Sequence, residues 1–255
     1  MSILDKIVLQ KKKEIHALKN MKIDFVSTEN ESKPSFFSQL SKPGLNLIAE
    51  IKKASPSAGV IREDFDPVGL SLEFVKSGAS ALSVLTDEKF FLGHLDYLND
   101  VRQHVSIPIL RKEFILDTIQ VKQSACHGAS AILLILSILD YDQAQRLLDC
   151  AAKYNLDVLI EVHDESELEC LLKLEGVKVI GFNNRNLNTF TVDINHSLKM
   201  KQQLSNTHLK DCLYVAESGY KNVKELDALK ENNFNGVLIG EGLALDEKLG
   251  SYFKK

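Results

Sequence analysis

Residues 46–52 read NLIAEIK, an apolar run that carries a glutamate and a lysine at its end. Three further runs have a similar form: IPILRKEF at 107–114, LDVLIE at 156–161 and CLYVAE at 212–217. A charged side chain at the end of a buried strand is costly to desolvate unless it is paired. Several such endings in one chain indicate a ring of acidic and basic groups at one end of a parallel sheet, as in an active site.

Apolar segments of this kind recur along the chain and predict eight strands. Most are rich in Ile, Val and Leu with little alternation, which is typical of parallel strands covered on both faces. Their ends recur every 22 to 34 residues, the length of one strand, one helix and two loops. The expected strands are 46–52, 81–86, 107–112, 130–136, 156–161, 178–183, 212–217 and 235–240.

Between these strands the sequence has the signals of helices. Helices begin with a proline or an aspartate cap and end before glycines, and they are expected at 67–77, 140–153, 165–174 and 221–231. The tripeptide GAS occurs at 78–80 and again at 128–130, each time just before an expected strand. It predicts the same helix-to-strand turn twice, with glycine ending the helix.

Eight strand–helix units predict an α/β fold, a (β/α)8 TIM barrel, for which roughly 250 residues are typical. An open doubly wound sheet is the alternative. Such a sheet normally has fewer strands and a glycine-rich nucleotide-binding turn, and neither G-x-G-x-x-G nor G-x-x-x-x-G-K-[ST] occurs in this sequence. We expect one domain over residues 1–255. Residues 46–250 form the barrel, and residues 1–45 form a helical extension packed over its bottom or rim.

Composition excludes several classes of function. The net charge of −4 offers no general basic field for nucleic acid or an anionic membrane. No apolar stretch approaches the roughly 20 residues of a membrane span, and the N-terminus lacks the apolar core of a signal peptide. A mitochondrial presequence is opposed by Asp5 and Glu14. We therefore expect a cytoplasmic protein.

The four cysteines form no CxxC pair and have no neighbouring histidine cluster in the sequence: Cys126, Cys150, Cys170 and Cys212. This spacing predicts reduced packing residues in a cytosolic protein, and no metal site. The only histidine near the expected strand ends is His163, which we interpret as a loop residue.

The expected strand ends collect the groups that can do chemistry, because function in such a barrel lies at the C-terminal ends of the strands. Side chains alternate along a strand, so Glu50 and Lys52 should point the same way, into the mouth. Carboxylates and amines in one pocket shift each other's pKa values, as general acid–base catalysis requires. A structural ion-pair network is the alternative. The candidates are Glu50, Lys52, Lys112, Glu161, Asn183, Arg185, Glu217 and Ser218.

Two short glycine turns follow the last two expected strands: SG at 218–219 and GEG at 240–242. Barrels often bind phosphate there through backbone N–H groups. The loop KKASPSAG at 52–59 is long enough for a lid, and its Lys53 and Ser55 are placed to close over the phosphate. Ordinary tight turns are the alternative.

Aromatic residues also follow expected strands. Phe90 and Phe91 come after 81–86, and Phe114 comes after 107–112. They are suited to sandwich a flat apolar ligand, although packing under their own loops is the alternative.

These residues lie in segments that resemble the indole-3-glycerol phosphate synthase family, barrel enzymes of tryptophan biosynthesis with a helical N-terminal extension. The matching segments are several residues long and follow the family's order. They are AEIKKASPSAG (49–59), SVLTDEKFFLG (83–93), PILRKEFI (108–115), LIEVHDE (159–165), IGFNNRNLNTF (180–190), VAESG (215–219) and VLIGEGL (237–243).

The resemblance implies a reaction that needs no cofactor and no metal. The substrate is 1-(2-carboxyphenylamino)-1-deoxyribulose 5-phosphate, and the products are indole-3-glycerol phosphate, CO₂ and water. The stand-alone length and the helical extension favour a monomer. Local departures from the family, such as Leu92-Gly93-His94 after the aromatic pair, touch no expected acid or base.

The resemblance also implies roles for individual residues. Lys112 would be the main general acid toward the ketone oxygen, and Glu161 would donate or accept the proton during dehydration. Lys52 would hold the substrate carboxylate and share in the acid role. The remaining implied roles are the orientation of the amine and the sugar hydroxyls by Glu50 and Asn183, and control of the lysine charges by Glu217.

Two binding regions are implied in the same way. The phosphate would be held by Ser55, Ser218, Gly219, Gly240 and Glu241. The anthranilate and sugar pocket would be lined by Phe91, Phe114, Leu133, Arg185 and Leu187.

Two other functions remain possible on the residues alone. Phosphoribosylanthranilate isomerase is a phosphate-binding barrel whose chemistry requires a cysteine and an aspartate at strand ends, and no expected strand end carries a cysteine. A non-catalytic sensor that kept the barrel is opposed by the intact acid–base set, though not by the fold itself.

Overall fold

Eight parallel strands close into a barrel in the computed structural model, which describes residues 1–21, 33–186, 189–240 and 247–254. The strands are β1 (Asn46–Ile51), β4 (Ala81–Leu85), β5 (Ile109–Lys112), β6 (Ala131–Ile135), β7 (Asp157–Val162), β8 (Val179–Asn183), β9 (Leu213–Glu217) and β10 (Gly236–Ile239). They pair in chain order, and β1 closes the ring by pairing with both β10 and β4. The predicted (β/α)8 TIM barrel is confirmed, and each strand lies within two residues of its expected range.

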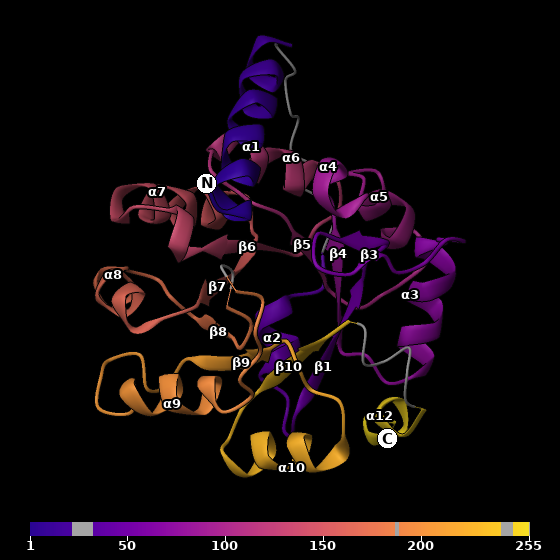
Figure 1. Cartoon of the computed structure of the whole chain (residues 1–255), viewed down its shortest axis with the longest axis vertical. Coiled ribbons are helices and arrows are strands. Elements are labelled where there is room, and N and C mark those ends of the chain that lie inside the picture. Colours follow the sequence, from indigo (N-terminus) through magenta and orange to yellow (C-terminus); the bar gives the residue numbers. More distant parts are fainter. Residues whose placement is uncertain (22–32, 187–188, 241–246, 255) are drawn as a thin grey trace.

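Helices surround the barrel (Figure 1). Those outside it are α3 (Pro67–Lys76), α5 (Tyr97–Arg102), α6 (Thr118–Cys126), α7 (Tyr141–Lys153), α8 (Leu168–Lys173), α9 (His196–Gln203), α10 (Val223–Glu231) and α12 (Glu247–Tyr252). Shorter turns are α4 (Glu88–Phe91), η1 (Leu136–Ile138) and η2 (Glu165–Glu167).

The helix boundaries follow from local chemistry. Side chains of Asp66, Asp140 and Asn222 accept backbone N–H bonds at the starts of α3, α7 and α10. Gly78 and Gly128 have φ angles of 90° and 80° where α3 and α6 end. This left-handed conformation favours glycine, so the turn predicted from the repeated GAS is confirmed.

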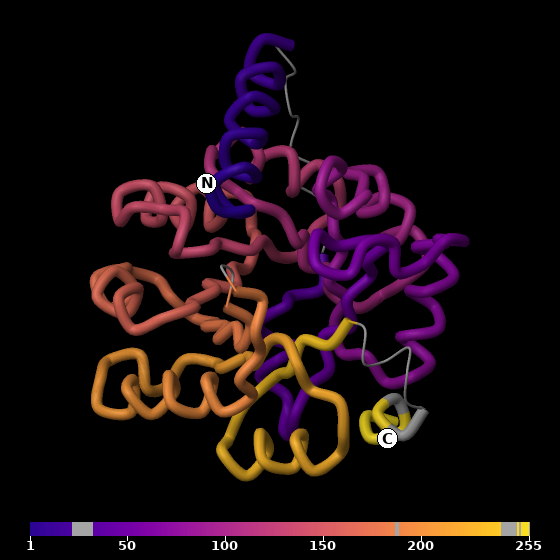
Figure 2. Tube along the Cα trace, viewed as in Figure 1, coloured from indigo at the N-terminus to yellow at the C-terminus, as the bar shows by residue number. Residues whose placement is uncertain are grey.

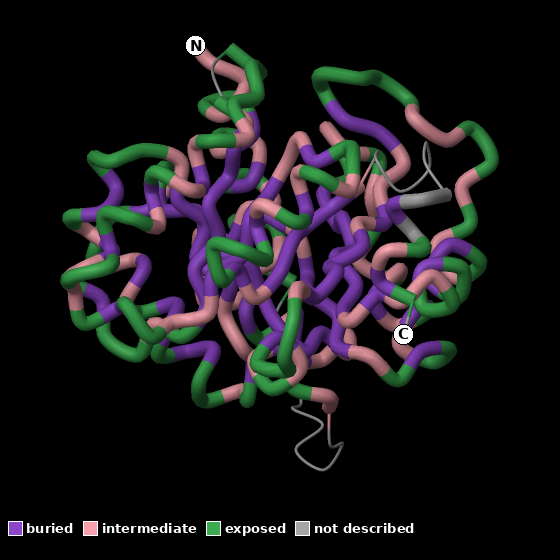
Figure 3. The backbone as a smooth tube through the Cα atoms, turned by 90° about the horizontal axis from the view of Figure 1, so that it is seen from below, coloured by how far each residue is buried: buried purple, intermediate pink, exposed green. Residues whose placement is uncertain are grey.

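Buried residues gather in the middle of the molecule, and most exposed residues lie at its periphery (Figure 3). One apolar cluster fills the space between strands and helices, and a second fills the barrel interior with side chains such as Ile48, Leu110 and Leu159. Parallel strands covered on both faces explain why the sequence shows continuous apolar runs. No helix among the described residues is long and apolar enough to cross a membrane.

The N-terminal extension contributes helices at both ends of the barrel. At the bottom, α2 (Phe36–Leu40) inserts Phe36 and Leu40 into the inner apolar cluster, as expected. In contrast, α1 (Ile3–Asn20) lies at the opposite end, where its residues contact the loops that follow β4 and β5. Figure 2 shows this indigo helix against the magenta part of the chain that contains α6.

The loop after β1, which is long enough for a lid, has regular structure of its own. Its residues form a small antiparallel hairpin of β2 (Ala54–Ser55) and β3 (Gly59–Val60), in which Ala54 pairs with Val60 and Ser55 with Gly59. Strand pairing therefore holds the backbone of Ser55, and Ser55 is buried.

Candidate active site

A cavity of about 200 Å³ opens at the C-terminal ends of the barrel strands. Most of the residues expected from the sequence line it together: Glu50, Lys52, Phe91, Lys112, Phe114, Leu133, Glu161, Asn183, Arg185, Glu217, Ser218, Gly219 and Gly240. Alternation along parallel strands, which sends every second residue toward the barrel axis, explains the position of the side chains on the strands, and the loops that follow the strands supply the others.

One expected residue, Ser55, lies beside this cavity, and two others cannot be placed. Ser55 lines an adjoining cavity, together with Lys52, Phe91 and residues of α1 that include Leu4 and Ile7. Leu187 and Glu241 lie outside the described residues. The extension was expected over the bottom or the rim of the barrel, and nothing in the sequence of α1 indicates that its apolar residues line the mouth.

Lys112, at the end of β5, is one of the cationic residues that line the cavity. Its Nζ lies 2.7 Å from Oε2 of Glu161 and 3.5 Å from Oε2 of Glu217. Burial disfavours the charged amine, but the surrounding carboxyl groups, with Glu161 the largest contributor, outweigh burial and raise the pKa of Lys112. The lysine is therefore an ammonium at neutral pH, ready to meet a developing negative charge.

A second lysine and carboxylate pair lies on β1 and its following loop. Nζ of Lys52 is 2.5 Å from Oε1 of Glu50. Burial opposes ionisation of Glu50, yet the charges of Lys52 and Lys112 lower its pKa below the ordinary value. The expectation that Glu50 and Lys52 point the same way is confirmed by this contact.

Two glutamates in the cavity have opposite pKa shifts. Burial opposes ionisation of Glu161, but the charges of Lys112 and His163 hold its pKa well below the usual range. Burial raises the pKa of Glu217 well above the usual range, and the charge of Glu161 raises it further. Glu161 is thus the carboxylate and Glu217 favours the uncharged acid, a separation of roles typical of acid–base sites.

Glycines make room for these carboxyl groups. A Cβ atom added to Gly181, which pairs with Glu161 across β7 and β8, would lie 2.2 Å from Oε1 of Glu217. A Cβ atom added to Gly240 would lie 2.7 Å from Oε1 of Glu50. The backbone at these positions approaches the carboxyl groups more closely than any side chain allows.

His163 contacts Glu161, which its place in a loop did not predict. It follows β7 in a loop, as expected, but its side chain is only 8% exposed and its Nε2 lies 3.0 Å from Oε1 of Glu161. Burial opposes protonation of the ring, but the charge of Glu161 prevails and raises the pKa of His163. The amide of Asn183 donates to the same Glu161 oxygen at 3.2 Å.

An aromatic wall closes one side of the cavity. The rings of Phe91 and Phe114 have centroids 5.9 Å apart and planes inclined by 38°. Both line the main cavity and the adjoining one, so both rings face the open space of the site.

The turn after β9 provides the polar side. Ser218 and Gly219 have φ angles of 69° and 94°, so two successive residues adopt left-handed conformations. A Cβ atom added to Gly219 would lie 2.3 Å from Cγ1 of Val192. Tyr220 and Lys221, which the sequence analysis did not select, also line the cavity at this turn.

No group of three or more His, Cys, Asp and Glu residues within the described ranges is arranged to hold a metal ion. The chemistry available to the described side chains is proton transfer and charge stabilisation by amines, carboxyl groups and an imidazole.

Comparisons with known proteins match the whole barrel. The family model for indole-3-glycerol phosphate synthase matches residues 4–254. A relative of that name from Endomicrobium trichonymphae is 43% identical over 247 residues, which cover 94% of each chain. A relative of the same name from Priestia megaterium is 45% identical over 243 residues, which cover 94% of this chain and 92% of the other.

A solved structure of phosphoribosylanthranilate isomerase from Thermotoga maritima superposes with a TM-score of 0.57. It is 11% identical in sequence and covers 82% of this chain and 96% of its own. That likeness concerns the fold alone. From the family model and the full-length relatives, the chain belongs to the indole-3-glycerol phosphate synthase family of carboxy-lyases.

Proposed function

We propose that this chain converts 1-(2-carboxyphenylamino)-1-deoxyribulose 5-phosphate into indole-3-glycerol phosphate, CO₂ and water at the cavity described above. The observation that carries the proposal is the Lys112 ammonium, which lies among carboxyl groups and close to an aromatic wall. Family membership and the full-length relatives support the same reaction.

The ring-closure step explains the need for a buried cation. A carbon nucleophile attacks a ketone, so negative charge develops on the ketone oxygen and must be stabilised or protonated. We assign this role to Lys112. Lys52 holds the substrate carboxylate until CO₂ leaves and shares in the acid role.

The later loss of water requires a second acid–base group with a different pKa. Glu161 has this role because its carboxylate is held by Lys112, His163 and Asn183. Glu217 favours the uncharged acid, and its protonation therefore limits the negative charge around Lys112.

Substrate orientation divides between the two sides of the cavity. Glu50 and Asn183 orient the amine and the sugar hydroxyls, with Arg185 beside them. The phosphate is bound by Ser55, Ser218, Gly219, Gly240 and Glu241. The anthranilate ring packs against Phe91, Phe114, Leu133 and Leu187.

A fluorescence assay tests the reaction. The folded protein is incubated with the substrate, and formation of the indole product is followed by its emission. Absence of product from folded protein would sink the proposal.

Replacing Lys112 tests the assignment of the acid. Lys112→Ala should lower kcat by at least about 10²-fold, because the group that meets the oxyanion is lost. Lys173→Ala is the matched control, since Lys173 is an exposed lysine that also pairs with a glutamate at 2.7 Å. Near-normal turnover of Lys112→Ala would transfer the acid role to Lys52.

We also propose that residues 1–255 act as one domain, as a monomer in the cytoplasm, and without a metal or other cofactor. Turnover should then be unchanged after dialysis against a chelator, and light scattering should give the mass of one chain. Loss of activity on chelation, restored by a divalent cation, would contradict the cofactor-free reaction.

A further inference from the structure

Lys11 on α1 is almost completely buried, at 3% side-chain exposure. It lies on the buried face of the helix with Ile7 and Ile15, four residues to either side. A buried lysine is costly unless its charge is compensated.

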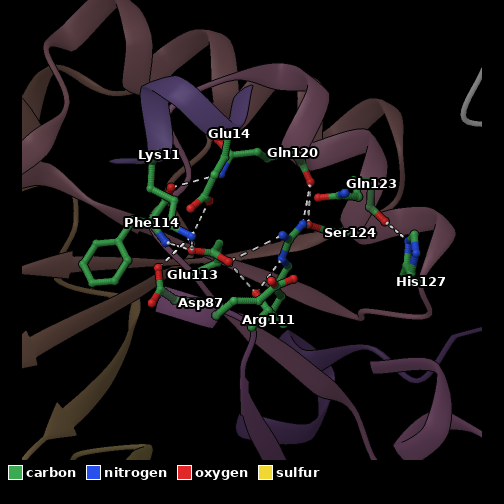
Figure 4. A network of polar contacts seen from close by, with 12 residues as sticks. Lys11, Glu14, Asp87, Arg111, Glu113, Phe114, Gln120, Gln123, Ser124 and His127 are labelled. Atoms are coloured by element: carbon green, nitrogen blue, oxygen red, sulfur yellow. Dashed lines mark hydrogen bonds and ion pairs between the residues drawn. The ribbon is translucent and has the colours of Figure 1, made fainter. Parts of the chain in front are cut away.

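Three carboxylates compensate this charge (Figure 4). Nζ of Lys11 lies 2.7 Å from Oε2 of Glu14, 2.7 Å from Oδ2 of Asp87 and 3.1 Å from Oε1 of Glu113. Glu14 belongs to the same helix, whereas Asp87 follows β4 and Glu113 follows β5. Lys11 therefore joins α1 to two separate loops at the mouth of the barrel.

Each of these two loops carries one ring of the aromatic wall. Oδ1 of Asp87 accepts the backbone N–H of Phe90 at 2.6 Å and of Phe91 at 3.1 Å. Oε1 of Glu113 accepts the backbone N–H of Phe114 at 2.9 Å. Two of the three carboxylates that bind Lys11, those of Asp87 and Glu113, thus also hold the backbone of Phe91 and Phe114.

The buried charges of this network balance one another. Arg111, 4% exposed, lies 3.6 Å from Oε2 of Glu113, and the hydroxyl of Thr86 donates to the same oxygen at 2.7 Å. The buried cations Lys11 and Arg111 match the buried carboxylates of Asp87 and Glu113. Removing Lys11 alone would leave an excess negative charge behind the aromatic wall.

We propose that Lys11 is a positioning residue for the aromatic part of the substrate: it ties α1 to both loops and so sets the separation of Phe91 and Phe114. Substrate recognition by this wall rests on the proposed function, but the link between α1 and the wall is tested by ligand binding alone.

The test compares two ligands on the full-length protein by calorimetry. In Lys11→Met, the dissociation constant for indole-3-glycerol phosphate should rise about tenfold, as expected when an apolar contact surface is misaligned. The dissociation constant for glycerol 3-phosphate, which has no aromatic ring, should stay within a factor of two. The KM for substrate should rise with the first constant, more than kcat falls.

Two variants separate positioning from general damage. Lys11→Arg keeps the charge and should restore most of the affinity for the indole ligand. Lys19→Met removes a lysine from the same helix, where it pairs with Asp117 at a more exposed position, and should bind both ligands normally.

A charge-balanced variant covers the case in which Lys11→Met does not fold. Lys11→Met combined with Glu113→Gln removes one buried charge of each sign, and the amide oxygen can still accept the N–H of Phe114. This double variant should show the same selective loss of indole-ligand affinity. Normal affinity in a folded variant, or equal weakening of both ligands, would overturn the positioning role. Absence of turnover in the unaltered protein would instead overturn the proposed function.

Discussion

At the residue scale, Gly181 occupies a position where even a methyl group would displace the buried carboxyl of Glu217. Gly181→Ala should therefore lower kcat by about 10- to 100-fold, because a displacement of about 1 Å in a catalytic constellation has effects of that size. Steady-state turnover at a temperature where the variant is folded measures it.

Gly236→Ala is the matched control for this substitution. Gly236 begins β10 at the other end of the barrel, where an added Cβ atom would approach side chains at 3.3 and 3.4 Å. Its kcat should stay within a factor of two. If both alanine variants lose activity equally, the clash with Glu217 is not the cause.

The pKa of Glu167 predicts a dependence of stability on pH. Burial raises this pKa from 4.5 to about 7, against the N–H and ring of His163, with Asp164 and Glu161 adding to the rise. The folded protein therefore binds the Glu167 proton more tightly than the unfolded chain. Its stabilising effect is complete below about pH 4.5 and is lost as the pH rises toward 7.

Glu167→Gln should remove this loss. Between pH 5 and pH 7.5 the melting temperature of the variant should fall less than that of the unaltered protein, by the equivalent of about 2 kcal/mol. Glu165→Gln, an exposed change on the same turn, is the control. Parallel melting curves for Glu167→Gln and the unaltered protein would show that Glu167 is already ionised across this range.

Residue spacing accounts for what the sequence could predict about the cavity. Alternation along a strand places Glu50 and Lys52 on one side, and the same rule, applied to Glu161 and His163, would have found the buried histidine. Lys11 also has a signal, because it interrupts the apolar stripe of Ile7 and Ile15. Its partners could not be predicted, since they lie far away in the chain and depend on where α1 docks.

At the scale of elements, the side-chain amide of Asn46 helps to hold α2 at the bottom of the barrel, beside the apolar contacts of Phe36 and Leu40. Nδ2 of Asn46, a residue that is 6% exposed, lies 2.9 to 3.3 Å from four backbone carbonyl oxygens, which share its two N–H donors: those of Leu40, Lys42, Gly44 and Asn235. Asn46→Ala should lower the free energy of unfolding by about 2 kcal/mol, because buried carbonyls lose their donor.

Activity should not follow this loss of stability. The bottom face of such a barrel serves stability, whereas its opposite end carries the chemistry. Urea unfolding and steady-state kinetics of Asn46→Ala should therefore show a lower midpoint with unchanged kcat/KM, and Ser38→Ala on the exposed side of α2 should alter neither. A large change in kcat/KM would contradict the separation of the two faces.

Elements differed in how well the sequence predicted them. The strand and helix limits agree closely because aspartate and asparagine caps, glycine stops and apolar runs are local signals. The hairpin of β2 and β3 was not expected, since each strand has two residues and too little pattern to recognise. The position of α1 at the mouth depends on tertiary ion pairs, which no local pattern encodes.

At the scale of the whole molecule, the regular recurrence of apolar runs was enough to predict a closed barrel. The number of units and the lack of a nucleotide-binding turn together favoured this barrel over an open sheet. Closure itself joins distant parts of the chain, because Asn46 pairs with Gly236 and Ala49 with Ile239.

This seam between β1 and β10 has a consequence for biosynthesis. Glu50 lies on the first barrel strand, and its close neighbour Gly240 follows the last one. Long-range pairing of this kind forms late, after most of the chain is available. The ring of acids and bases is therefore completed only when β10 has left the ribosome. Translation of a truncated mRNA then yields a fragment without a site, rather than a weakly active enzyme.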